Sequence, residues 1–167
     1  LGGRQEAALL AAGLGLEHFL DLRQDAIDAA AHRETGTPRT IEEKLADAAT
    51  VHRLTGLAPA VALHIPWDTV PDYAALARYA GDLGVRLGTV NSNTFQDDDY
   101  KFGSLTHTDK AVRQKAIDHH LACIEVMNQT GSRDLKIWLA DGTNYPGQGD
   151  IRGRQDRLAE SLAADRK

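Results

Sequence analysis

The stretch Leu135–Asp150, which reads LKIWLADGTNYPGQGD, decides the fold class of this 167-residue chain. Its apolar beginning predicts a short strand over residues 135–140 that stops at Asp141 and Gly142. A turn-rich loop follows, and a helical pattern begins at Ile151. Strand, polar loop and helix in this order form one βα unit, and α/β barrels place their chemistry in such loops, at the C-terminal ends of parallel strands.

Two earlier segments repeat this order. They read VALHIPWD at Val61–Asp68 and VRLGTVNSNTFQDDDYKFG at Val85–Gly103, with strands predicted over residues 61–65 and 85–90. Both strands are nearly continuously apolar, as strands are when both faces of a parallel sheet are covered. Each ends in polar and aromatic residues, so the three strand ends are expected to form one shared site.

Cap residues and helical periodicity mark the helices between these strands. Thr40 with Glu43 forms a capping box, and Asp109 and Asp150 are further N-cap candidates. The predicted helices run from Thr40 to Gly56, from Pro71 to about Leu83, from Asp109 to Met127, and from Asp150 to the end of the chain. Strands that alternate with helices of this length predict a parallel sheet.

We therefore predict an α/β fold that is part of a (β/α)8 barrel, with about three βα units behind leading helices. A closed barrel takes about 250 residues, so a small open sheet is the alternative. The whole chain, 1–167, is expected to be one partial barrel domain. Residues 1–37 form a helical N-terminal segment with a helix over about 6–31, and residues 38–158 carry the βα units.

Composition excludes several classes of partner. The net charge of -5 gives no electrostatic reason to expect nucleic acid or an anionic membrane. No apolar run approaches the roughly 20 residues that span a bilayer. The single cysteine, Cys123, cannot form an internal disulfide, which fits a reducing cytoplasm. On its helix it is expected to be buried and inert.

The strand ends offer His64, Trp67, Phe95 and Trp138 as candidate site residues. A neutral imidazole at His64 could exchange a proton with a sugar ring oxygen, or it could simply be satisfied by local backbone. The three aromatic rings could stack on the apolar face of a sugar, or they could anchor loops and fill the core.

Other polar groups are less informative. The run Asp97–Asp99 could ligate a metal, but neighbouring carboxylates do not converge automatically, and a solvated run that orders its loop is the alternative. His119 and His120 point about 100° apart on a helix, which is not metal-binding spacing, so both are expected at the surface. We assign no metal ligand in the chain.

Four segments resemble bacterial L-rhamnose isomerases, of the xylose-isomerase-like barrel superfamily. They read RTIEEKLADAATVHRLTG, PAVALHIPWD, VNSNTFQDDDYKFGSLTH and GSRDLKIWLADGTNYPGQGDIRGRQDRL, and together they cover roughly residues 38–158. The resemblance implies a TIM barrel, usually a homotetramer, that interconverts an aldose and a ketose, L-rhamnose and L-rhamnulose. Divalent cations, typically Mn²⁺, would hold the open-chain sugar while a hydride moves between C1 and C2.

By the same resemblance, His64 contacts the substrate near the ring-opening oxygen, while Trp67, Phe95 and Trp138 line the sugar pocket. The family's metal ligands lie on later strands, and no matching cluster occurs here. We therefore expect an N-terminal portion of such an enzyme that has no isomerase turnover alone and that self-associates. A sugar epimerase on the same barrel and a non-catalytic fragment or interaction module are the alternatives.

Overall fold

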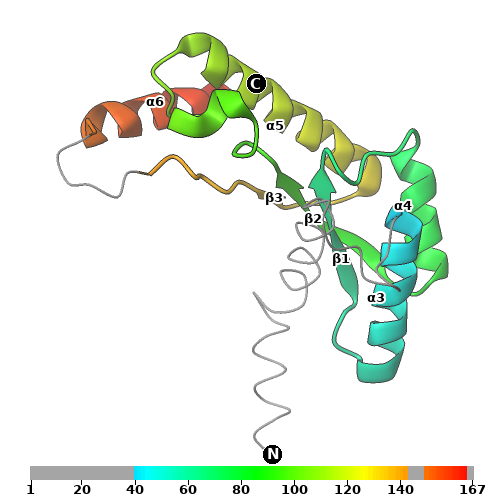
Figure 1. The fold of residues 1–167 in the computed structure, drawn as a ribbon. Helices are drawn as coiled ribbons and strands as arrows, with labels where there is room; N and C mark the ends of the chain where they lie inside the picture. The colour runs from blue at the N-terminus through cyan, green and yellow to red at the C-terminus, as the bar shows by residue number, and fades with distance from the viewer. Residues whose placement is uncertain (1–39, 143–148, 165–167) are drawn as a thin grey trace, which may run out of the picture.

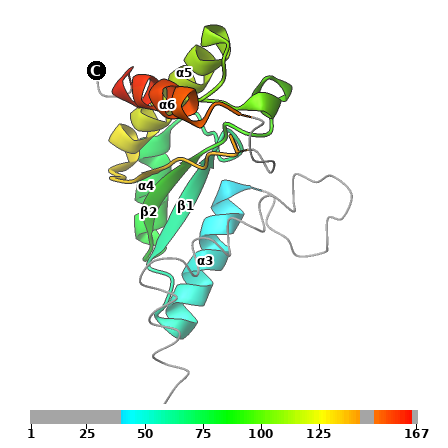
Figure 2. The ribbon, with the colours of Figure 1, turned by 90° about the vertical axis from the view of Figure 1, so that its left-hand side faces the viewer.

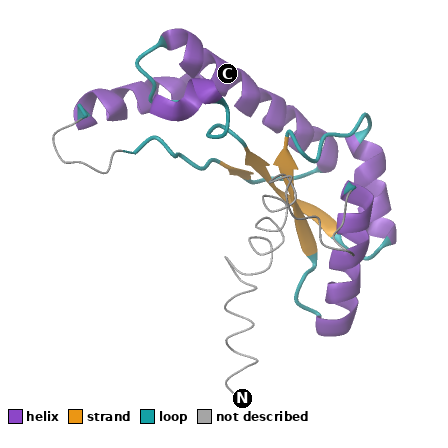
Figure 3. Cartoon of the chain, in the orientation of Figure 1, coloured by secondary structure: helices purple, strands orange, loops and turns teal. Residues whose placement is uncertain are grey.

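The structure, a computed structural model, describes residues 40–142 and 149–164 of the chain (Figures 1 and 3). The helix predicted over residues 6–31 lies outside these ranges. In chain order the elements are α3 (Ile41–Thr55), β1 (Ala60–Ile65), α4 (Tyr73–Asp82), β2 (Arg86–Ser92), the 3-10 helix η1 (Asp98–Phe102), α5 (Lys110–Thr130), β3 (Leu135–Lys136) and α6 (Ile151–Ala164). Helices and strands alternate, which confirms the predicted α/β class.

The three strands form one parallel sheet in the order β1-β2-β3. Val61 of β1 pairs with Leu87, whereas Leu63 pairs with Val90, so β2 holds one more residue than β1 between these pairs. Such a bulge changes which residues of a strand share a face. Here it brings Leu87 and Val90 onto the same face of the sheet although they are three residues apart.

Helices α3, α5 and α6 begin at the cap residues that the sequence indicates, whereas α4 begins after Asp72 rather than at Pro71 and α5 runs to Thr130 rather than Met127. Thr40 Oγ1 accepts a hydrogen bond from the Glu43 backbone N–H at 3.2 Å, and Gly56 ends α3 in the left-handed conformation. Asp109 caps α5 in the same way, and Asp150 Oδ1 accepts the Gly153 N–H at the start of α6. Side-chain acceptors of this kind satisfy backbone donors that the first turn leaves free.

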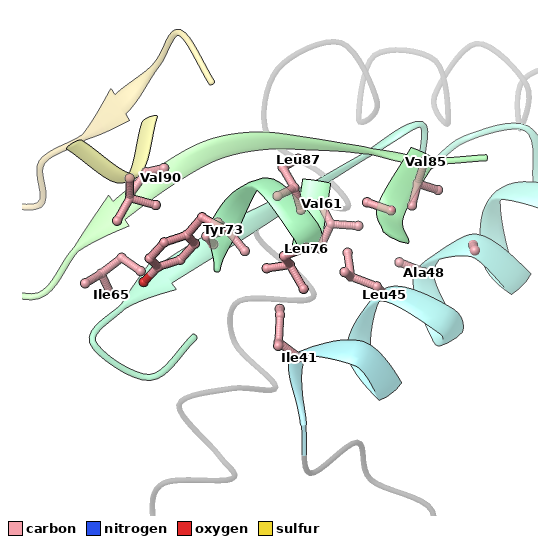
Figure 4. Packing of buried hydrophobic residues seen from close by; sticks show 14 of the residues in the cluster. Ile41, Leu45, Ala48, Val61, Ile65, Tyr73, Leu76, Val85, Leu87 and Val90 are labelled. Carbon is pink, nitrogen blue, oxygen red and sulfur yellow. The ribbon is translucent and has the colours of Figure 1, made fainter. Parts of the chain in front are cut away.

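The main core lies between the sheet, α3 and α4 (Figure 4). Leu45 of α3 and Leu63 of β1 are fully buried, and Leu76 of α4 packs in the same cluster. Burial of each leucine side chain stabilises the fold by about 1.5–3 kcal/mol. The core thus fixes β1 against the two helices that flank it in sequence.

A second, smaller core joins α5, α6 and the loop that follows η1. Tyr100, Leu105 and Ile117 are buried there, and Leu158 of α6 packs against them. The two helices lie side by side in both ribbon views (Figures 1 and 2). Arg157 Nε donates to the Thr106 carbonyl at 2.7 Å and Ser161 Oγ donates to the Leu105 carbonyl at 2.8 Å, so α6 is held by this loop.

Two sequence predictions are wrong. The strand predicted over 135–140 ends at Lys136, because the chain leaves β2 there and turns toward the loop after η1. His119 and His120 are not surface residues: His120 is fully buried and His119 is half-buried. The two side chains lie on different faces of α5, as neighbouring helix residues do. Both faces are covered, because α5 contacts β2, α4 and α6.

No helix among the described residues combines the length and the apolar character that crossing a membrane requires.

Gly103 is a position where an added methyl group should be destabilising. Its φ of 118° is strained for other residues, and a Cβ there would lie 3.0 Å from Thr106 Oγ1 and 3.3 Å from Asp141 Oδ2. We expect Gly103→Ala to lower the free energy of unfolding by about 1–3 kcal/mol in urea denaturation. Gly81→Ala is the control, since a Cβ meets nothing within 4 Å in α4 and should stabilise the protein by about 0.5–1 kcal/mol. Equal effects at both positions would contradict this account of Gly103.

Candidate functional site

The carboxyl ends of the strands bring polar groups from all three strands into one row. His64 of β1 pairs with Asn91 of β2, and Asn91 pairs with Lys136 of β3. Residues in register on neighbouring strands point to the same face of a sheet. Because the strand ends share one edge, as predicted, this row forms the floor of the candidate site.

A buried ion pair between Lys44 and Asp68 lies next to the backbone of His64. Lys44 Nζ lies 2.8 Å from Asp68 Oδ2, and their side chains are only 4% and 2% exposed. The same Asp68 oxygen accepts the backbone N–H of His64 at 2.7 Å, and the Asp68 N–H donates to the His64 carbonyl. The Asp68 carboxylate therefore links Lys44, in the first turn of α3, to the backbone near the C-terminal end of β1.

His64 is 5% exposed, and its imidazole is held in the neutral form. The pKa of His64 is lowered to about 4, mainly by burial and further by the positive charges of Lys44 and Lys136 and by the nearby His119. A neutral imidazole has one ring nitrogen that accepts a proton and one that carries it. At neutral pH the group can therefore accept a proton or orient a hydroxyl.

The aromatic candidates form two pairs. The rings of His64 and Trp67 meet edge to face with centroids 4.2 Å apart, and the rings of Phe95 and Trp138 meet in the same way at 4.5 Å. Trp67 and Phe95 are half-buried, whereas 59% of Trp138 is exposed. The second pair joins the loop after β2 to the segment after β3 and leaves much of the indole surface open to a ligand.

Lys44 is the site residue that the sequence reasoning missed. A lysine is expected to face solvent, and α3 carries other charged residues that do. The helical spacing did indicate that Lys44 is buried, because it lies three residues after Ile41 and four before Ala48, on the apolar face of the helix. The carboxylate that accepts its charge, Asp68, is 24 residues away in sequence, so no local pattern pairs them.

The remaining polar candidates stabilise the surroundings of the site. Lys115 Nζ lies 2.7 Å from both Asp97 and Asp99, and its hydrogen bond lowers the pKa of Asp97. This bears out the alternative of a solvated run that orders its loop. His119 Nε2 accepts the Asn93 N–H at 3.1 Å, which ties α5 to the end of β2. Cys123 is buried, as predicted, and burial raises the pKa of its thiol to about 12.

The described residues do not provide a set of side chains that could bind a metal ion. Across residues 40–142 and 149–164, no group of three or more histidine, cysteine, aspartate or glutamate side chains could hold one. Asp68 is engaged by Lys44, and Asp97 and Asp99 are engaged by Lys115. The functional groups that the described part of the site offers are therefore the neutral imidazole of His64 and the aromatic rings.

Two bacterial proteins, both named probable sugar isomerase, are similar to most of the chain. The one from Rhizobium meliloti (strain 1021) is 46% identical over 134 residues, which are 77% of this chain and 31% of that protein. The one from Mesorhizobium japonicum is 40% identical over 134 residues, with the same shares. The chain thus spans about a third of the length of these relatives.

A second similarity is much shorter. A catechol 1,2-dioxygenase of Acinetobacter baylyi is 60% identical over 45 residues, which are 27% of this chain and 14% of that enzyme. A match of this length shows that the two proteins share one short segment, and it does not place this chain in the dioxygenase family. No family model matches the chain.

Proposed function

We propose that this chain supplies part of the substrate site of a sugar isomerase that interconverts an aldose and a ketose. The observation that carries the proposal is that His64 and the Phe95–Trp138 pair lie at or just beyond the ends of neighbouring parallel strands, in a chain that is 46% identical over 134 residues to a probable sugar isomerase. The resemblance of residues 38–158 extends the proposal to a partial (β/α)8 barrel and to L-rhamnose and L-rhamnulose as the sugar pair.

Each described group has a role that its chemistry supports. The faces of Trp138 and Phe95 would pack against the C–H groups of the sugar, because aromatic rings and the apolar face of a pyranose both lose hydration on contact. His64, held neutral, would accept the proton of the anomeric hydroxyl while the bond between C1 and the ring oxygen breaks and the ring oxygen takes up a proton from water. Trp67 would keep the imidazole in place through their edge-to-face contact.

The proposal includes a divalent cation, Mn²⁺ by resemblance, which would polarise the oxygens on C1 and C2, the two carbons between which the hydride moves. The described residues do not hold it, so its ligands would come from elsewhere in the isomerase. A homotetramer and a cytoplasmic location are further parts of the proposal. Neither nucleic acid nor a membrane is proposed as a partner.

Sugar binding can be measured without a label, because both tryptophans of the chain, Trp67 and Trp138, lie in the candidate site. We expect L-rhamnose to change their emission saturably. Phe95→Ala should weaken this binding by about tenfold, since an aromatic contact of this kind contributes about 0.5–1.5 kcal/mol. Phe102→Ala is the matched control, because that phenylalanine is 72% exposed on η1.

A linear response to L-rhamnose, or equal responses of the two variants, would overturn the assignment of the site. The same samples with Mn²⁺ are expected to form no ketose. Ketose that disappears on addition of a chelator would place the metal ligands within this chain. An epimer of the substrate as the product would favour an epimerase.

We also propose that the chain self-associates. In the described sheet β1 and β3 are edge strands, and Phe102, Ile151 and Trp138 are 72%, 66% and 59% exposed. Open strand edges and exposed apolar side chains favour association. Sedimentation velocity should show a weight-average mass that rises with concentration, and Ile151→Lys should reduce the rise. A single monomer boundary at every concentration would contradict the prediction.

A further inference from the structure

Asp141 stands out among the carboxylates of this chain, because it is buried and its oxygens already accept four hydrogen bonds. Oδ2 accepts the backbone N–H groups of Ser104 at 2.8 Å and Thr106 at 3.0 Å, and the Thr106 hydroxyl at 2.7 Å. Oδ1 accepts the Ser104 hydroxyl at 2.9 Å. The side chain is 8% exposed, so these oxygens are occupied and its role is to hold two segments together.

The segment that Asp141 anchors contains Trp138. The ladder of β3 ends at Lys136, and residues 138–140 are exposed. Trp138 thus directly follows Ile137, which packs against the second core, and it lies three residues before Asp141. An extended chain covers at most about 3.3–3.6 Å per residue, so release of Asp141 would allow the indole to move by several ångströms.

The other end of the anchor belongs to the loop that carries Phe95. Ser104 follows η1 in the long connection between β2 and α5, and Phe95 is in the first part of the same connection. There Asn93 Oδ1 accepts the backbone N–H groups of Phe95 at 3.4 Å and Gln96 at 3.3 Å, which shapes the turn around the ring. Asp141 therefore joins the two segments whose rings meet.

The loop is also fixed from its other side. Arg157 and Ser161 of α6 donate to the carbonyls of Thr106 and Leu105. Because α6 holds the loop, the Asp141 hydrogen bonds constrain the position of the Trp138 segment rather than that of the loop.

We propose that Asp141 is a positioning residue that holds Trp138 against Phe95, so that the two rings form a preorganised surface for the sugar. The part of this inference that concerns the sugar rests on the proposed function. The part that concerns the two rings does not, and it can be tested without a ligand.

The experiment follows Trp138 alone, in a Trp67→Phe background. Asp141→Asn places an amide N–H₂ group where one oxygen accepted hydrogen bonds. We expect the fluorescence anisotropy of Trp138 to gain a fast local decay and acrylamide quenching to increase, both toward the values of Phe95→Ala in the same background. Asp150→Asn is the matched control, because that aspartate caps α6 and should leave both signals unchanged.

A folded Asp141→Asn variant whose Trp138 signals equal those of its parent would overturn the inference. If that variant does not fold, Ser104→Ala with Thr106→Val removes the two hydroxyl donors and keeps both backbone donors. It should give a smaller change in the same direction, and no change in this folded variant would also overturn the inference.

The affinity for L-rhamnose should also fall, by about tenfold in Asp141→Asn. Absence of any sugar response in the parent would count against the proposed function only, since the Trp138 signals still test the positioning role of Asp141.

Discussion

Lys44→Met is expected to lower the free energy of unfolding by about 3–5 kcal/mol, because it leaves the Asp68 carboxylate charged and buried without its cation. The pair is 2.8 Å apart and almost fully buried. Methionine keeps the length of the lysine stem, so the loss measures the missing charge rather than a cavity. Urea denaturation followed by circular dichroism at neutral pH gives the difference.

Two further variants separate the charge from the packing. Lys44→Met combined with Asp68→Asn removes both charges and should recover most of the loss, since a buried ion pair and a neutral pair of similar volume are often close in stability. Lys115→Met is the matched control at an exposed pair, where the cost should stay below about 1 kcal/mol. Similar losses at positions 44 and 115, or no recovery in the double variant, would refute the role given to the buried pair.

Acid is expected to destabilise the protein through His64. The pKa of His64 is about 4 in the folded protein and 6.5 in its ordinary state, so the unfolded chain binds the proton more tightly. The contribution of His64 to stability is therefore complete above pH 6.5 and is lost as the pH falls toward 4. The expected loss is about 2–3 kcal/mol. The pKa of His119 is lowered too, which adds to the loss in the same pH range.

His64→Gln isolates this contribution, because carboxylates such as Asp97 titrate equally in both proteins. The difference in unfolding free energy between wild type and variant should shrink between pH 7.5 and pH 4. His52→Gln, at the C-terminal end of α3, is the matched substitution outside the candidate site. A constant difference for His64→Gln would show that folding leaves the pKa of this imidazole at its ordinary value, which would contradict the prediction.

Local chemistry made most of the fold predictable. Thr40, Asp109 and Asp150 cap the helices that the sequence assigned to them, because a side-chain acceptor at a helix start acts within three residues. Continuously apolar strands between such helices indicated a parallel sheet, and the sheet is parallel. The meeting of parallel strand ends at one edge made a contact between the segments after β2 and β3 expected, and the rings of Phe95 and Trp138 do meet, although the sequence did not predict this particular pair.

The features that could not be predicted depend on partners far away in sequence. Lys44 is buried because Asp68 meets it across the fold, and His120 is buried because α5 has neighbours on several sides. The strand predicted through Ala140 ends early because Asp141 binds Ser104 and Thr106, 37 and 35 residues earlier. Periodicity reports which face of an element is apolar, and it does not report what covers the opposite face.

The extra residue in β2 sets limits on how this chain can change in evolution. Val90 shares a face with Leu87, three residues away, because the strand carries that residue, and Asn91 then meets His64 across the sheet. Deletion of residue 88 or 89 would make the spacing of the two strands equal, so Val90 would stay opposite Leu63 and Asn91 would stay opposite His64. Insertion of one more residue would enlarge the irregularity, so this short interval should tolerate the loss of one residue more readily than the gain of one.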